Sequence, residues 1–597
     1  MSTLIKRSDV ALQDTWCLED IFTTDDLVKE GMKEARALLD GFKVYEGKLT
    51  SSAEVLYEAL QKSDEASKLV EKIYVYSHMR LHQDGGNSFY QDLSSQSEKL
   101  LVDFQTALSF VNPELSTLTE TDVEKLIASY EPLKLYKRSL EEVLRQKEHI
   151  LDAKMEDVLS QFREIATAPS NTYAMFNNAD IKFPIIQDSQ GTPIQITHGN
   201  FIDFLEGHDR RVREEAFKGV YHTYSSFKNT LGTNFAANVT QYSLFAKLRN
   251  FKSPLHAALD ANNIPVEVYN NLIHTMGEHM NLMHRYMGLR KEIMGVDELH
   301  MYDLFVPLVS DFTKEITYDE ACSIVLEALK PLGEDYTALV KEAFENRWVD
   351  KYENEGKRSG AYSWGCFDAP HPYVLMNYTN NVNNLFTLAH EIGHAMHSYL
   401  SSHTQPYPYA DYCIFVAEVA STVNEALLMQ YLLKTTTDEA FRKYLVNYFM
   451  EQFRTTIYRQ TMFAEFEKMV YDMHMEGVTL TSQTLSDTYY ALVKKYHGDH
   501  MVVDREIAME WARIPHFYTP FYVYQYATGY SAAIALSESI LNEGEEAVKR
   551  YKNFLSGGSS KDPIDLLKDA GVDMSTPAPI EAALKVFENL IEEMRSL

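Results

Sequence analysis

Apolar residues recur every three or four positions along most of this chain, which is the spacing of an amphipathic helix. The pattern predicts helices over Glu54–His82, Leu93–Leu108, Leu140–Phe162 and Val212–Ala246. Proline (18 residues) and glycine (25 residues) are sparse, as a chain of long helices requires. The sequence therefore predicts an all-α, mostly helical fold.

Two segments depart from the helical pattern. Ile181–Thr197 holds two β-branched apolar runs around a polar turn with Gly191, which predicts a β-hairpin. Tyr373–Tyr378 predicts a short strand, so we expect a small antiparallel β element near the functional site. We place a domain boundary close to Gly199–Asn200. It separates an N-terminal helical domain over residues 1–200, which ends in the hairpin, from a larger helical domain over residues 201–597.

Charge and composition exclude several classes of function. The 597 residues carry a formal net charge of −30, with 86 acidic and 56 lysine or arginine side chains, and such a field repels nucleic acid and anionic membranes. The four cysteines are scattered, which indicates neither a disulfide scaffold nor a cysteine-ligated metal. Met1–Phe22 is polar and lacks the apolar core of a signal peptide. We therefore expect a cytoplasmic protein with no nucleic-acid or membrane partner.

The segment His390–His394 carries the pattern His-Glu-x-x-His. Residues four apart share one face of a helix, so both imidazoles can reach a single metal ion. Glu391 projects at an angle to the pair and can act as a general base toward water. Glu418 follows 24 positions after His394 and supplies a third ligand. Two histidines and a carboxylate are typical of catalytic zinc, which keeps its fourth position open, so we expect one Zn²⁺ per chain.

The sequence around Glu418 supports this ligand set. Phe415–Ser421 is an apolar run in which an unpaired carboxylate would be costly to bury, and a cation partner removes that cost. Glu425 lies seven residues further on, close to the same helix face. It is either a hydrogen-bond acceptor for a ligand histidine or a solvated surface glutamate. The ligand set also tolerates cobalt or manganese in place of zinc.

A tyrosine-rich segment, His516–Tyr530, holds five tyrosines after its leading histidine. Phenol and imidazole N–H groups can stabilise the oxyanion that forms when a peptide carbonyl is attacked. The alternative is that these tyrosines are wall residues with hydroxyls in water.

Five segments together resemble oligoendopeptidase F of the M3 metallopeptidases, with thimet oligopeptidase as a more distant relative. The resemblance is closest from about Arg358 to Tyr530, and a looser likeness covers most of the chain. The segments are Arg358–Gly365 (RSGAYSWG), Tyr373–Tyr378 (YVLMNY), Thr387–His397 (TLAHEIGHAMH), Phe415–Ser421 (FVAEVAS) and the tyrosine-rich segment.

The resemblance implies a helical shell around a deep substrate channel and endopeptidase action on short peptides. It implies zinc held by His390, His394 and Glu418, with Glu391 as the base. It also implies that a peptide pairs by β-addition with the strand at Tyr373, Val374, Leu375, Met376 and Asn377. The candidates for transition-state stabilisation are His516, Tyr522, Tyr526 and Tyr530, and Tyr524 stays open beside them.

Two other functions remain compatible with the sequence. A dipeptidyl carboxypeptidase would share the zinc site and would hold the free carboxylate of its substrate with a cation such as Arg505 or Arg513. A non-catalytic peptide-binding protein would carry structural zinc, although such a site needs no base at Glu391. The sequence leaves the oligomeric state open between monomer and homodimer.

Overall fold

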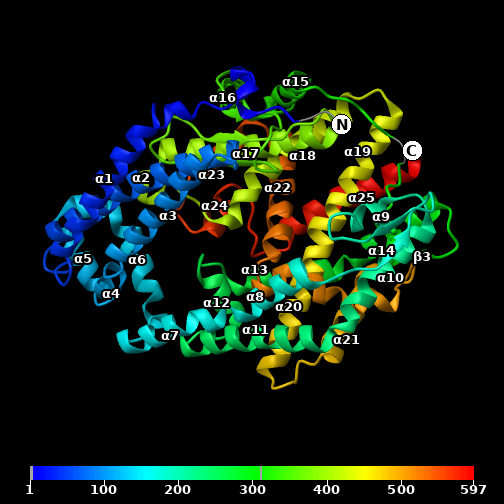
Figure 1. Cartoon of the computed structure of the whole chain (residues 1–597), viewed down its shortest axis with the longest axis horizontal. Coiled ribbons are helices and arrows are strands. Elements are labelled where there is room, and N and C mark those ends of the chain that lie inside the picture. The colour runs from blue at the N-terminus through cyan, green and yellow to red at the C-terminus, as the bar shows by residue number, and fades with distance from the viewer. Residues whose placement is uncertain (1–3, 310–311) are drawn as a thin grey trace. The chain divides into compact units, whose positions relative to one another are not determined.

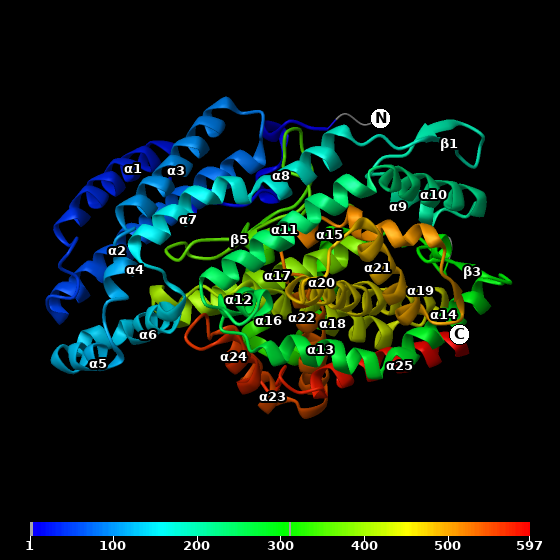
Figure 2. The same ribbon diagram turned by 90° about the horizontal axis from the view of Figure 1, so that it is seen from below.

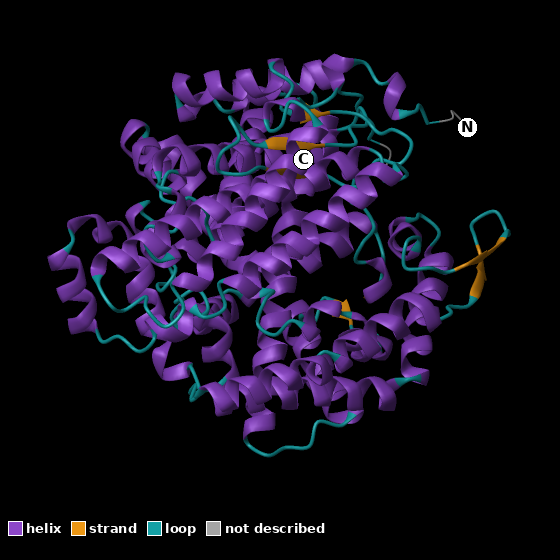
Figure 3. Ribbon diagram, turned by 60° about the vertical axis from the view of Figure 1, so that its left-hand side comes forward, coloured by secondary structure: helices purple, strands orange, loops and turns teal. Residues whose placement is uncertain are grey.

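The computed structural model describes residues 4–309 and 312–597. Helices dominate these residues, and the few strands are short (Figure 3). The predicted all-α fold is confirmed. In the described part of the chain, no helix is both long enough and apolar enough to cross a membrane.

The chain forms two compact units, each assembled from three separate stretches. Unit 1 comprises Met1–Glu148, Thr313–Tyr431 and Leu536–Gly571, and unit 2 comprises the stretches between and after them. The predicted boundary near residue 200 is a single cut in the chain and stays a prediction.

In the described residues, unit 1 contains three strands and the helices of its three stretches. Two further helices, α18 and α22, continue from one unit into the other. The elements are α1 Asp25–Asp40, α2 Ala53–Gln83, α3 Ser88–Ala107, α4 Val111–Leu115, α5 Glu120–Ser129, α6 Lys137–Arg145, α15 Tyr318–Ala328, α16 Glu334–Glu345, β4 Val349–Asp350, β5 Tyr362–Trp364, β6 Tyr373–Leu375, α17 Val382–Thr404, α18 Ile414–Thr435, α22 Tyr524–Glu543, α23 Glu545–Leu555 and α24 Pro563–Asp569.

Unit 2 contains the hairpin and the remaining helices. Its elements are α7 Ala153–Ala166, α8 Ala168–Met175, β1 Ile185–Gln187, β2 Pro193–Gln195, α9 Phe201–Glu206, α10 Arg210–Ser226, α11 Lys228–Leu248, α12 Pro254–Asp260, α13 Val266–Glu278, α14 Met280–Met294, β3 Leu299–His300, α19 Glu439–Gln452, α20 Arg459–Met475, α21 Ser482–His497, β7 Met501–Val502 and α25 Ala578–Ser596.

The first three helices of unit 1 lie side by side (Figure 1). Ser52 begins α2, because its hydroxyl accepts a hydrogen bond from the Val55 backbone N–H at 3.3 Å. The apolar faces of the three helices share one buried cluster with Trp16 and with Tyr373 and Leu375 of β6. This shared core fixes the small sheet against the N-terminal helices.

The sheet of unit 1 has the order β4-β6-β5. β6 pairs antiparallel with β5 and parallel with β4, so the predicted antiparallel element is part of a mixed sheet. The outer side of β4 is covered, because the backbone N–H of Lys351, directly after the strand, donates to the Asp14 carbonyl at 3.0 Å. In the described residues, β5 is the strand at the other edge of this sheet and pairs only with β6.

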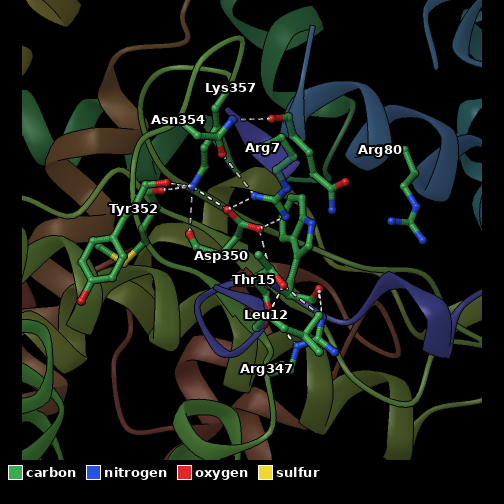
Figure 4. A network of polar contacts seen from close by, with 12 residues as sticks. Arg7, Leu12, Thr15, Arg80, Arg347, Asp350, Tyr352, Asn354 and Lys357 are labelled. Carbon is green, nitrogen blue, oxygen red and sulfur yellow. Dashed lines mark hydrogen bonds and ion pairs between the residues drawn. The ribbon is translucent and has the colours of Figure 1, made fainter. Parts of the chain in front are cut away.

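A buried ion cluster supports β4 (Figure 4). The carboxylate of Asp350, 1% exposed, accepts from the Arg7 guanidinium at 2.5 Å and pairs with the Lys357 ammonium at 2.6 Å. Lys357 also donates to the Met376 carbonyl at 2.6 Å, and Arg7 to the Asn354 side chain at 3.3 Å. A charge that is removed from water needs partners of this kind. Here these contacts connect the N-terminal segment with β4 and with the residue directly after β6.

In unit 2, α25 runs beside α13 and α14 (Figure 2). A π-helical turn, Phe453–Tyr458, joins α19 to α20, so that the two helices form one continuous helix. The predicted hairpin is confirmed, with Ile186 opposite Ile194 in antiparallel register.

Most predicted helices are confirmed, and one is wrong. The patterns at 54–82 and 93–108 correspond to α2 and α3, and the pattern at 212–246 corresponds to α10 and α11, which are separated at Phe227. The single helix predicted at 140–162 is interrupted between α6 and α7. Asp152 begins α7 there, since its side chain accepts from the Met155 N–H at 2.9 Å.

Candidate metal centre

The two histidines of the His-Glu-x-x-His pattern lie on α17. Asn381 begins this helix, because its side chain accepts from the Asn384 N–H at 2.8 Å. Four residues apart, the imidazoles face one another with Nε2 atoms 3.2 Å apart. Both rings are partly exposed, with side-chain exposures of 26% for His390 and 18% for His394.

Glu418 of α18 completes a cluster with this pair. Its Oε2 lies 3.4 Å from Nε2 of His390 and 3.7 Å from Nε2 of His394. All three ligand atoms lie within 4.8 Å of one another. The structure thus brings together the three predicted metal ligands. Two imidazole nitrogens and one carboxylate oxygen converging on one point fit a zinc ion.

Gly393 allows α17 and α18 to cross this closely. A Cβ at this position would lie 2.6 Å from the Ser421 Cα and 2.9 Å from the Ala420 carbonyl oxygen. Both atoms belong to the backbone of α18, so neither can rotate away. A glycine inside a buried helix is a recognisable signal in the sequence, because it weakens the helix unless close packing requires it. We did not predict this role of Gly393.

Polar contacts behind the ligands fix their orientation. Oε1 of Glu425 lies 2.6 Å from Nδ1 of His390, and the His394 ring hydrogen-bonds the backbone of Ala417. Asn424, fully buried, donates from α18 to the Ala389 carbonyl of α17 at 3.2 Å. With its Nδ1 bonded to a carboxylate, His390 directs Nε2 toward the point shared by the ligands.

Carboxylates give the centre an excess of negative charge. Burial lowers the pKa of His390, but Glu425, Glu391 and Glu418 outweigh it and raise that pKa to about 9. Burial and the neighbouring His390 lower the pKa of His394 to about 3. Burial also raises the pKa of Glu391, 6% exposed, to about 7. Three carboxylates around two imidazoles favour a bound cation.

A strand edge lies beside Glu391. The Ser363 backbone of β5 hydrogen-bonds the Glu391 carboxylate, and no sequence pattern predicts this interaction. β6 is flanked on both sides, and Tyr373, Val374, Leu375 and Met376 are at most 1% exposed. A peptide that paired with Tyr373–Asn377, as predicted from the resemblance, would have to displace a neighbouring strand.

The tyrosine-rich segment belongs to unit 2, whereas the metal ligands belong to unit 1. His516, Tyr522 and Tyr526 form one ring cluster, with ring centroids 5.6–6.1 Å apart. Tyr530 instead packs against Phe453, with ring centroids 5.3 Å apart. Tyr524 packs against Tyr269 at 5.0 Å. The structure therefore groups three of the five candidate side chains.

Comparisons with known proteins agree on one family. A family model described as Peptidase family M3 matches residues 204–586, and one described as Oligopeptidase F matches residues 114–183. Oligopeptidase PepF of Bacillus subtilis (strain 168) is 50% identical over 591 residues, which cover 99% of this chain and 88% of the relative.

Solved structures extend the likeness to three dimensions. A crystal structure from Chlamydophila abortus aligns with a TM-score of 0.92 at 33% identity and covers 100% of both chains. Oligoendopeptidase-F from Enterococcus faecium aligns with a TM-score of 0.74 at 36% identity, covering 96% of this chain and 99% of that one.

Proposed function

This chain is a member of peptidase family M3, and we propose that it is a zinc-dependent endopeptidase that hydrolyses internal bonds of short peptides. The observation that carries the proposal is the convergence of His390, His394 and Glu418 beside the buried carboxylate of Glu391. When bound, zinc supplies a Lewis acid that polarises the scissile carbonyl and makes water more acidic.

Glu391 acts as the general base in this proposal. It takes a proton from the attacking water and then delivers that proton to the leaving amine. Its carboxylate is held at the active face of α17 by the backbone of Ser363, so it needs little reorientation before the reaction. Glu425 keeps the His390 ring in the orientation required of a metal ligand.

We place the peptide backbone along β5 rather than β6. β5 is the edge strand of its sheet, and an edge can accept an additional strand. The backbone of Ser363 then lies next to both the general base Glu391 and the proposed path of the peptide substrate.

His516, Tyr522 and Tyr526 are our candidates for stabilising the oxyanion. Their ring cluster offers an imidazole and two phenols as donors. Tyr524 is 2% exposed and Tyr530 is 8% exposed, and both pack against other aromatic rings, so we rank them lower.

The exopeptidase alternative has weaker support. Both arginines that could hold a substrate carboxylate already have acidic neighbours, since Arg505 lies 2.5 Å from Asp487 and Arg513 lies 3.6 Å from Glu510. An endopeptidase needs no such cation.

The test uses an internally quenched peptide with an amidated C-terminus. We expect the purified protein to cleave it at an internal bond, to stop when a chelator is added, and to recover when zinc is restored. Cleavage only of the version with a free C-terminal carboxylate would favour the exopeptidase. Zinc binding without hydrolysis of any peptide would instead favour a non-catalytic role.

A further inference from the structure

A cavity of about 830 Å³ adjoins the metal centre within unit 1. Three of its lining residues connect it to the site: Ser363 of the edge strand, Ser398 of α17 and Ala417, the neighbour of the ligand Glu418. Ser363 and Trp364 of β5 both line the cavity, and successive side chains of an extended peptide paired with this strand point to opposite sides. The cavity is therefore positioned to receive one side chain of such a peptide.

The walls of the cavity are aromatic. Tyr74, Trp364, Phe367, Tyr407 and Tyr412 all line it. Aromatic faces bind the methylene stem of a long side chain and attract a cationic head group.

Glu71 of α2 gives this cavity its charge. Its carboxylate accepts hydrogen bonds from the Phe367 backbone and from the Tyr407 hydroxyl. A carboxylate can accept about four hydrogen bonds, so it can accept further ones from a ligand. Burial, then the nearby charge of Asp411, raises the pKa of Glu71 to about 7. In the described part of the chain, no basic side chain forms an ion pair with Glu71. Its carboxylate therefore lacks a charged partner.

The two lysines nearest to Glu71 along α2 direct their ammonium groups toward aromatic rings instead. The Lys68 ammonium lies 5.0 Å from the centroid of the Phe367 ring, and the Lys72 ammonium lies 5.0 Å from that of Phe22. Neither lysine lines the cavity. Two histidines, His371 and His403, do line it, and burial lowers the pKa of His371.

We infer that this cavity is a specificity pocket for a lysine or arginine side chain of the peptide substrate, with Glu71 as its counter-ion. The inference rests on the proposed peptidase function and adds a substrate class to it: short peptides with a cationic residue at one fixed position relative to the cleaved bond. The aromatic walls enclose the stem, and Glu71 with the rim residue Asp411 faces the charge.

The test compares peptides that differ only in one charge. A series of internally quenched peptides with blocked ends carries a single lysine at successive positions on either side of the cleaved bond. A matching series carries acetyl-lysine, which has nearly the same length but no charge. We expect the wild-type protein to prefer lysine over acetyl-lysine in kcat/KM at one position, by about tenfold or more, as a charge-assisted hydrogen bond provides.

Glu71→Gln should abolish this preference, so that kcat/KM for the lysine peptide falls to the level of the acetyl-lysine peptide cleaved by the same variant, and its thermal unfolding midpoint checks that the variant is folded. Glu71→Asp keeps the charge and should keep much of the preference. The matched control Glu124→Gln removes an exposed acid of α5 from the same unit and should behave as wild type.

The outcomes separate the two proposals. Efficient cleavage of both series with no lysine preference at any position would overturn the pocket and leave the peptidase function intact. A preference that survives in Glu71→Gln would overturn the role of Glu71. If the wild-type protein cleaves no peptide in either series, both proposals are wrong.

Discussion

At the scale of single residues, a substitution of Glu391 tests catalysis separately from metal binding. It lies beside the ligands, and its carboxylate is bonded to Ser363. Glu391→Gln should therefore keep the zinc content of the wild-type protein while kcat falls by roughly 10²–10⁴, the usual contribution of a general base. Elemental analysis and peptide hydrolysis measure the two quantities, with Glu124→Gln as the control. Turnover close to that of wild type would remove Glu391 from the mechanism.

A second residue prediction concerns Glu467 of α20. This side chain is fully buried; one carboxylate oxygen accepts from the Phe521 N–H at 3.0 Å, and the other has no hydrogen-bond partner in the described structure. Burial raises the pKa of Glu467 to about 8. The unfolded chain, with a glutamate pKa of about 4.3, loses this proton at lower pH, so the stability contributed by the protonated carboxyl declines as the pH rises from about 5 to 8.

Glu467→Gln removes this proton linkage and keeps an oxygen to accept from Phe521. The stability of the variant relative to wild type should increase with pH, by up to about 1.4 kcal/mol per pH unit. Tyr269 and Tyr471, which face Glu467, keep their protons throughout, because burial raises their pKa values well above 10. Denaturant titrations at pH 5, 6.5 and 8 measure the difference. A difference that does not change with pH would mean that Glu467 is ionised in the folded protein.

At the scale of secondary-structure elements, the contact of α17 with α18 determines the ligand geometry. Gly393→Ala places a methyl group 2.6 Å from the α18 backbone, so the helices must separate. Overpacking of this kind costs about 1–3 kcal/mol, and we expect zinc affinity to fall about tenfold or more although every ligand is present. Competition with a chromogenic chelator measures this affinity.

The control for that experiment is Gly277→Ala in α13, where the added Cβ meets nothing within 4 Å. It should leave zinc affinity unchanged and slightly stabilise the helix. Equal zinc affinity in the two alanine variants would show that the close crossing does not set the ligand positions.

The sequence predicted those elements that depend on local pattern. The helical period identified α2 and α3, two β-branched apolar runs around a glycine turn identified the hairpin, and the spacing of His390 and His394 identified their shared face. Features that depend on tertiary contacts were not predictable. The position of β5 at the edge of its sheet depends on which strands pair with β6. The interruption before α7 depends on the Asp152 side chain, which caps a new helix although the apolar pattern at 140–162 is continuous. The contact of Tyr522 with Tyr526 depends on packing, because Tyr522 lies before α22 begins at Tyr524 and helical spacing does not apply to it.

At the scale of the whole molecule, the net charge of −30 at pH 7 should influence how substrates arrive. A field of one sign raises the association rate of oppositely charged ligands, and salt screens it over about 30 Å at 0.01 M and about 8 Å at 0.15 M. For a peptide of net positive charge we expect kcat/KM to fall several-fold between these salt concentrations. A neutral peptide of the same length is the control. Parallel salt curves for the two peptides would show that long-range attraction does not contribute.

The junction of Arg7 with Asp350 has a practical consequence for anyone who prepares this protein. Proteolytic trimming past Asp14 would take away one cation of the buried cluster and the carbonyl that covers the end of β4. A bare strand edge of this kind recruits other chains. Trimmed preparations should therefore self-associate on storage, and an affinity handle is better attached after Leu597 than before the N-terminal segment.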